Sequence, residues 1–171
     1  MNKYHEGAFR YTFPREWKVF RLQTDEFYRR QFQGFNGGSK EVDFIALDGN
    51  DCLWLLEAKD FSNHPRSNPR DLAEEVADKV RDSLACLEAM QVSSLSNPGS
   101  RVAGEGLSKA QSCRVVLHLE MPTPGNLALS PIDSSNVRMR LRQLLRGIDS
   151  TALVADQSRL RDEIPITISR N

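Results

Sequence analysis

The pattern of hydrophobic and polar residues predicts two adjacent strands followed by a helix in the first half of this chain. Residues 40–49 and 52–61 are rich in strand-forming residues, and the second segment carries an almost unbroken apolar run that is typical of a strand covered on both faces. The turn residues between them, Asp-Gly-Asn-Asp, favour a hairpin. Residues 71–90 then carry an apolar stripe at helical spacing, formed by Leu72, Val76, Val80, Leu84 and Leu87.

The same pattern predicts the remaining elements. Residues 114–120 indicate a buried strand, residues 134–148 a helix capped by Ser134 or Ser135, and residues 151–156 and 164–170 two short strands. Residues 7–13 alternate as a short strand, whereas residues 14–22 fit a helical turn or a strand equally well. We therefore expect one α/β domain over residues 1–171, with a mixed central sheet flanked by helices and a mobile Ser/Gly-rich insertion at residues 91–112.

Composition narrows the class of protein. Of the 171 residues 39% are hydrophobic, and the 23 Lys and Arg balance the 23 Asp and Glu. Zero net charge excludes a protein that coats nucleic acid through bulk positive charge. The chain has no apolar run of the ~18 residues that a transmembrane helix needs. Three widely spaced cysteines without a CxxC pair predict free thiols rather than disulfides or a zinc site. With no apolar leader in its first residues, we expect a cytoplasmic protein without a membrane partner.

Charged residues gather at one end of the two adjacent strands. Because side chains alternate along a strand, Glu57 and Lys59 share one face, and so do Glu41 and Asp43. Burying a lone carboxylate or ammonium is costly, so these groups need partners. Two carboxylates and a backbone carbonyl form a hard oxygen site for Mg²⁺ or Mn²⁺, and a neighbouring lysine can neutralise charge developing on a phosphodiester. The plainer alternative is an ion pair at a solvent-facing strand end.

These residues resemble the signature of the PD-(D/E)xK nuclease superfamily, which includes restriction endonucleases and Holliday-junction resolvases. Its signature is an acid on one core strand and acid-x-lysine on the next, matched here by Asp43 and by Glu57-Ala58-Lys59. The resemblance implies a restriction-endonuclease-like αβββαβ core. It also implies a Mg²⁺- or Mn²⁺-dependent endo- or exonuclease that acts on DNA rather than RNA.

The resemblance also implies roles for individual residues. Asp43, Glu57 and the carbonyl of Ala58 would bind the metal, and Lys59 would be the catalytic lysine. Lys79, on the following helix, would point back at the site as a further catalytic residue, unless it is an ordinary solvated lysine. Members of the superfamily often use one more acid, for which three glutamates are open: Glu16, Glu26 and Glu41.

The shared site sets a condition on the hairpin. Directly opposite residues of an antiparallel pair share a face, and a two-residue loop at Gly49-Asn50 would put Asp43 and Glu57 on opposite faces. We therefore predict an odd-numbered loop or a β-bulge between residues 44 and 56.

Arginines outside the signature are candidates for phosphate contacts. Arg66 and Arg70 lie in the loop after the second strand, and Arg138, Arg142 and Arg146 recur every four residues on the late helix, where a solvated helix flank is the alternative. Two functional classes follow. The first is a metal-dependent nuclease. The second is a catalytically inactive protein of the same fold that binds nucleic acid or another protein. Neutral net charge favours a homodimer or a partner subunit in either class.

Overall fold

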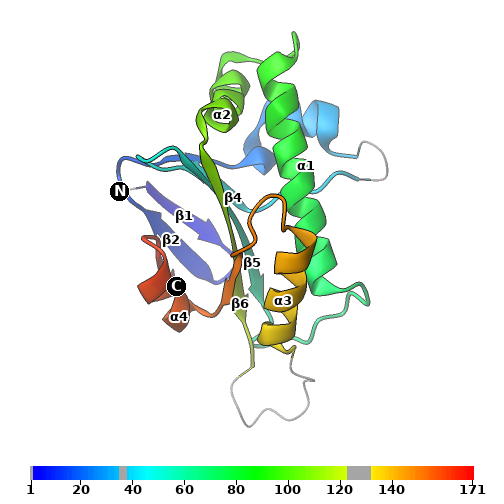
Figure 1. Ribbon diagram of the computed structural model, residues 1–171, viewed down its shortest axis with the longest axis vertical. Coiled ribbons are helices and arrows are strands. Elements are labelled where there is room, and N and C mark those ends of the chain that lie inside the picture. The colour runs from blue at the N-terminus through cyan, green and yellow to red at the C-terminus, as the bar shows by residue number, and fades with distance from the viewer. Residues whose placement is uncertain (1, 35–37, 123–131) are drawn as a thin grey trace.

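The computed structural model describes residues 2–34, 38–122 and 132–171, which form three layers. A five-stranded sheet is the middle layer, and helices α1 (Leu72–Val92) and α3 (Ser134–Leu144) cover one face (Figure 1). A three-stranded sheet and helix α4 (Gln157–Glu163) cover the other face. The prediction of an α/β fold with a mixed central sheet flanked by helices is confirmed.

The middle sheet is antiparallel on one side of its central strand and parallel on the other. Strands β3 and β4 pair antiparallel with each other and β4 pairs antiparallel with β5, whereas β6 and β7 run parallel to β5. Leu53 and Leu55 of β5 pack towards α1, and Leu56 packs towards the small sheet, which accounts for the unbroken apolar run. In order across the sheet the strands are β3 (Lys18–Phe20), β4 (Phe44–Leu47), β5 (Cys52–Asp60), β6 (Ser112–Glu120) and β7 (Leu153–Ala155).

The small sheet contains strands from both ends of the chain. It has the order β1-β2-β8 and is antiparallel throughout. The predicted alternation of residues 7–13 is confirmed, because Phe9, Tyr11 and Phe13 of β2 are buried against the middle sheet. The bounds are β1 (Asn2–Glu6), β2 (Phe9–Phe13) and β8 (Thr167–Arg170).

Two helix caps show how local chemistry sets the helix starts. Asp71 caps α1, where its side chain accepts a hydrogen bond from the Glu74 N–H at 2.9 Å. Asp133 caps α3 by accepting from the N–H groups of Ser135 and Asn136, so the prediction of a cap at Ser134 or Ser135 is wrong by one or two residues.

The segment 91–112, expected as a mobile Ser/Gly-rich insertion, is helical over most of its length. Residues Pro98–Lys109 form helix α2, which packs beside α1 (Figure 1). A Cβ at Gly104 would lie 2.7 Å from the Gln91 nitrogen and 2.8 Å from the Leu87 carbonyl oxygen. The two helix backbones therefore touch there, and only glycine allows this approach.

The N-terminal part differs from the expected αβββαβ order. Residues 14–22, left open between helix and strand, contain strand β3. Between β3 and β4 lie a 3₁₀ turn, η1 (Leu22–Thr24), and a π-helical turn, η2 (Tyr28–Phe32), which follows directly on two α-helical residues, 26 and 27. From β3 onward the order is βββ, then α1 and α2, then β6. Of the helices that the structure describes, none is long and apolar enough to cross a membrane.

Candidate active site

The β4–β5 hairpin brings Asp43 and Glu57 to the same place. Phe44 pairs with Leu56 and Leu47 with Leu53, so the register continued by one step puts Asp43 opposite Glu57. Three residues, 49–51, form the loop, because the Asp48 N–H donates to the Cys52 carbonyl at 3.1 Å. Asp51 has a φ of 56°, the left-handed residue that a three-residue hairpin loop requires. The predicted odd-numbered loop is confirmed.

Asp43 is joined directly to the Glu57-Ala58-Lys59 segment. Its Oδ2 accepts a hydrogen bond from the Ala58 N–H at 2.7 Å. The N–H and C=O of one strand residue point towards the same neighbouring strand, so the carbonyl of Ala58 is directed to the side on which Asp43 lies. This arrangement is compatible with the metal-binding role that the sequence predicted for Asp43 and for the carbonyl of Ala58.

Helix α1 holds the segment that leads into Asp43. The buried Ser83 hydroxyl accepts from the Val42 N–H at 3.0 Å, and Asp82 accepts from the Lys40 N–H at the same distance. Two backbone groups before Asp43 are thereby fixed to the helix that also carries Lys79. The position of Asp43 relative to α1 therefore depends on Ser83.

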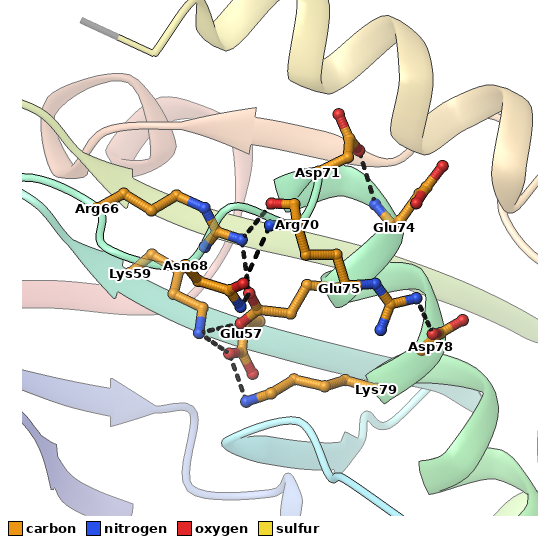
Figure 2. A network of polar contacts seen from close by, with 10 residues as sticks. All are labelled: Glu57, Lys59, Arg66, Asn68, Arg70, Asp71, Glu74, Glu75, Asp78 and Lys79. Carbon is orange, nitrogen blue, oxygen red and sulfur yellow. Dashed lines mark hydrogen bonds and ion pairs between the residues drawn. The ribbon is translucent and has the colours of Figure 1, made fainter. Parts of the chain in front are cut away.

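Glu57 is the most buried charged side chain of the site. It is 1% exposed and lies on the face of β5 that α1 covers (Figure 2). Its Oε1 accepts from Lys79 Nζ at 2.6 Å and lies 3.2 Å from Lys59 Nζ. Its Oε2 is buried and finds no hydrogen-bond partner among the described residues. The prediction that Lys79 points back at this carboxylate agrees with its position.

Burial dominates the electrostatics of Glu57. Desolvation, with a further contribution from the negative charge of Asp43, raises the pKa of Glu57 to about 7, although Lys79 and Lys59 act in the opposite direction. The carboxylate is therefore short of compensating positive charge despite its two lysines. A divalent cation on the Asp43 side would supply that charge.

Lys59 contacts a second acid that the sequence did not single out. Its Nζ donates to Glu75 Oε1 at 2.7 Å, while Arg66 and Asn68 donate to Glu75 Oε2 at 2.7 and 2.9 Å (Figure 2). Desolvation would raise the pKa of Glu75, but the hydrogen bonds from Lys59 and Arg66 outweigh it and lower this pKa to about 2. The sequence could have indicated Glu75, because it lies one helical turn before Lys79 on the same face of α1.

None of the three glutamates considered as the extra acid lies at Asp43 and Glu57. Glu41 accepts from the Tyr28 hydroxyl, Glu26 forms an ion pair with Arg30 at 2.9 Å, and Glu16 lies near Gly49 at the hairpin loop. The metal-binding role predicted for Glu41 is therefore not supported, because its carboxylate is turned towards Tyr28.

Glu6 of β1 is the further acid that lies near Asp43. Burial raises the pKa of Glu6, and the charge of Asp43 raises it further. Arg21 donates to the Glu6 carboxylate and lies over the Phe44 ring, 5.0 Å from its centroid. No sequence signal pointed to Glu6, because β1 was not predicted.

The arginines named from the sequence separate into bound and free groups. Arg66 is held by Glu75, and Arg70 forms an ion pair with Asp78. Arg142 donates from Nε to the Ala152 carbonyl at 2.9 Å, so it fastens α3 to the segment before β7. Arg138 is exposed beside a shallow depression along α3, which Arg142 and Arg146 also line. Arg138 is thus better placed for a phosphate contact than Arg66 or Arg142.

The donor set fits one hard cation with few protein ligands. In residues 2–34, 38–122 and 132–171, no three His, Cys, Asp or Glu side chains are grouped to hold a metal ion. The fit rests instead on the buried Glu57 carboxylate, which has an unpaired Oε2 and interacts with the charge of Asp43. Mg²⁺ is commonly bound by one or two carboxylates, with waters and substrate phosphate completing its coordination. Asp43, Glu57 and the Ala58 carbonyl match that pattern.

Comparison with known proteins gave no match among family models, curated proteins or solved structures.

Proposed function

We propose that this protein is a Mg²⁺- or Mn²⁺-dependent nuclease that hydrolyses phosphodiester bonds in DNA. The observation that carries the proposal is the buried Glu57 carboxylate, whose Oε2 is unpaired and whose charge interacts with that of a second acid, Asp43. A buried polar atom without a partner is uncommon in native proteins, and a bound ion, a water or a catalytic role can account for it. The choice of DNA follows from the resemblance to PD-(D/E)xK nucleases.

The order of elements around the site supports a restriction-endonuclease-like core. Strands β3, β4 and β5 are followed by α1 and, after the additional helix α2, by β6, which lies parallel to β5. The first acid, Asp43, directly precedes β4, and β5 carries the acid-x-lysine group. The expected first helix is replaced by the β1–β2 hairpin.

Each residue of the proposed site has a distinct task. Asp43 and Glu57, with the carbonyl of Ala58, would hold the ion, which when bound acidifies a water and polarises the scissile phosphate. Lys59 would stabilise negative charge on the phosphate oxygens as water attacks. Lys79 would keep Glu57 ionised by donating to Oε1, so that Oε2 remains free.

One observation favours the alternative of a catalytically inactive protein that binds nucleic acid or a partner. Lys59 and Arg66 already have carboxylate partners within the chain, at 2.7 Å from Glu75 in both cases. A lysine that already pairs with two internal acids has less charge to offer a substrate. The two functions differ in a single measurable property, which is metal-dependent cleavage.

The test is cleavage of supercoiled plasmid with Mg²⁺ or Mn²⁺ by wild type, Lys59→Ala and Lys109→Ala. Lys109 is an exposed lysine of α2 that faces Glu105 at 3.9 Å, so it serves as a matched control. We expect the Lys59 variant to lose activity by at least about a hundredfold and the Lys109 variant to match wild type. Equal inertness of all three on plasmid, linear DNA, single-stranded DNA and RNA would contradict the proposal and favour the inactive class.

A further inference from the structure

Lys59 lies closer to Glu75 than to the carboxylate of its own motif. Its Nζ is 2.7 Å from Glu75 Oε1 and 3.2 Å from Glu57 Oε1. The two acids approach it from different elements, Glu57 from β5 and Glu75 from the first turns of α1 (Figure 2). The Lys59 ammonium therefore pairs with one acid of the proposed metal site, Glu57, and with one acid outside it, Glu75.

Glu75 is itself held rigidly. Its side chain is 8% exposed, and Arg66 and Asn68 occupy the oxygen that Lys59 does not use. Arg66 is fixed in turn, since it also donates to the Arg70 carbonyl at 2.7 Å. Both oxygens of Glu75 are thus engaged, and a carboxylate near the start of a helix is further stabilised by the helix dipole.

An anchor outside the metal site matters once a cation binds. A divalent ion bound to Glu57 would neutralise part of the negative charge that attracts Lys59, and it would repel the Lys59 ammonium. Glu57 alone would then hold Lys59 less firmly at the stage when its position counts. Glu75 adds a charge-assisted hydrogen bond that does not involve the proposed metal ligands.

We propose that Glu75, held by Arg66 and Asn68, is a positioning residue that fixes the Lys59 ammonium beside Glu57. The proposal deepens the proposed nuclease function and rests on it for the role of Lys59 in catalysis. Arg66 accordingly acts by supporting Glu75 rather than by binding nucleic acid.

The first test observes the Lys59 ammonium directly and does not depend on nuclease activity. The hydrogen-exchange rate of its NH₃⁺ group is measured by lysine ¹H–¹⁵N correlation NMR, with the signal assigned through Lys59→Arg. We expect Glu75→Ala to raise this rate by roughly tenfold or more and Glu75→Gln to raise it less, because a neutral acceptor remains. Glu74→Ala is the matched control, since Glu74 is the exposed neighbour that pairs with Arg140 at 3.2 Å.

An unchanged Lys59 exchange rate in Glu75→Ala would overturn the proposal. Should Glu75→Ala fail to fold, Glu75→Gln decides in its place, and an exchange rate equal to that of wild type then overturns it.

The second test separates positioning from folding and metal binding. We expect Glu75→Ala to lower kcat for DNA cleavage by about tenfold to a hundredfold, with KM and Mn²⁺ affinity unchanged and partial recovery in Glu75→Gln. A wild-type kcat in Glu75→Ala would overturn the catalytic role of this contact. A wild type that cleaves no nucleic acid, together with faster Lys59 exchange in Glu75→Ala, would refute the nuclease proposal and uphold the anchoring of Lys59 by Glu75.

Discussion

Two buried polar clusters lie on opposite faces of the middle sheet, and they differ in whether their hydrogen bonds are complete. On the small-sheet face, the Tyr11 hydroxyl bonds His118 Nδ1 at 2.5 Å, and His118 Nε2 bonds Glu120 Oε1 at 2.9 Å. Glu120 Oε1 also accepts from the Gln157 N–H at 2.8 Å. On the α1 face, Glu57 leaves Oε2 unpaired.

The polar groups of the first cluster all have partners. A carboxylate only accepts, so His118 Nε2 donates to Glu120, and Nδ1 pairs with the Tyr11 hydroxyl, which can donate or accept. Burial, with added effect from the charge of Asp43, raises the pKa of Tyr11, which keeps its hydroxyl protonated. Such a chain stabilises the packing of β2 on β6 and needs no ligand.

The Glu57 cluster has the opposite character. It brings the Glu57 carboxylate together with the ammonium groups of Lys59 and Lys79. A buried acceptor without a hydrogen bond lowers the stability of the fold by about 1–3 kcal/mol, or by more when the acceptor is ionised. The contrast agrees with a structural role for Tyr11–His118–Glu120 and with the cation that we propose at Glu57 and Asp43. The predictions below test this difference between the two clusters.

The largest effect is expected from removing one charge at the α1-face cluster. Asp43→Asn keeps an oxygen that can accept from the Ala58 N–H but removes the negative charge beside Glu57. We expect DNA cleavage to fall by about a hundredfold or more, with the free energy of unfolding changed by less than about 1 kcal/mol. Plasmid cleavage and urea denaturation measure the two quantities. Cleavage at the wild-type rate would remove Asp43 from the site.

The affinity for Mn²⁺ should depend on pH through Glu57. With a pKa of about 7, Glu57 must lose a proton to bind the ion, so affinity should fall about tenfold per pH unit below 7 and level off above it. The folded protein also holds this proton more tightly than the unfolded chain. The contribution of Glu57 to stability without metal therefore decreases as pH rises from 4.5 to about 7. Mn²⁺ titration followed by electron paramagnetic resonance measures the affinity, and a flat profile between pH 5.5 and 8 would contradict the raised pKa.

The small-sheet cluster should respond in stability alone. Tyr11→Phe leaves His118 Nδ1 without its hydroxyl partner and should lower the free energy of unfolding by about 1–3 kcal/mol. We expect metal affinity and cleavage to stay within about twofold of wild type. Loss of cleavage in a folded Tyr11→Phe variant would show that the two clusters are not separate.

The smallest effect on metal binding is expected at Ser83, whose hydroxyl holds the backbone next to Asp43. Ser83→Ala leaves the buried Val42 N–H unpaired, at an expected cost of about 1–2 kcal/mol, and should weaken Mn²⁺ binding a few-fold by releasing Asp43. Ser100→Ala is the control, because Ser100 is equally buried but bonds Asp25 near α2. Equal Mn²⁺ affinity in the two variants would mean that Ser83 does not position Asp43.

The parts of the site that the sequence predicted depend on local patterns. The apolar runs around Asp43 and Glu57 define two strands. The face rule for a hairpin required an odd-numbered loop or a β-bulge, and the structure has a three-residue loop. The apolar stripe predicted α1 and its buried side, and Lys79, which the resemblance suggested at the edge of that stripe, donates to Glu57 of β5. Periodicity of two or of 3.6 residues is visible without knowledge of distant contacts.

The parts that were missed depend on contacts between distant segments. Glu6 approaches Asp43 only because β1 pairs with β2 and the hairpin packs on the middle sheet. Helix α2 has a Gly-rich sequence that reads as a loop, and it is stabilised by the close approach of Gly104 to α1. The partners of Glu75 come from a polar loop whose path no pattern in the sequence fixes.

The most direct test of a cation between Asp43 and Glu57 is a crystal structure with Mn²⁺, with the ion located by anomalous scattering at the manganese edge. We predict one peak at about 2 Å from Glu57 Oε2, close to the Asp43 carboxylate and the Ala58 carbonyl. The same peak should be absent in Glu57→Gln. At saturating Mn²⁺, an empty site in the wild type, or density only at other residues, would contradict the metal site and with it the proposed nuclease function.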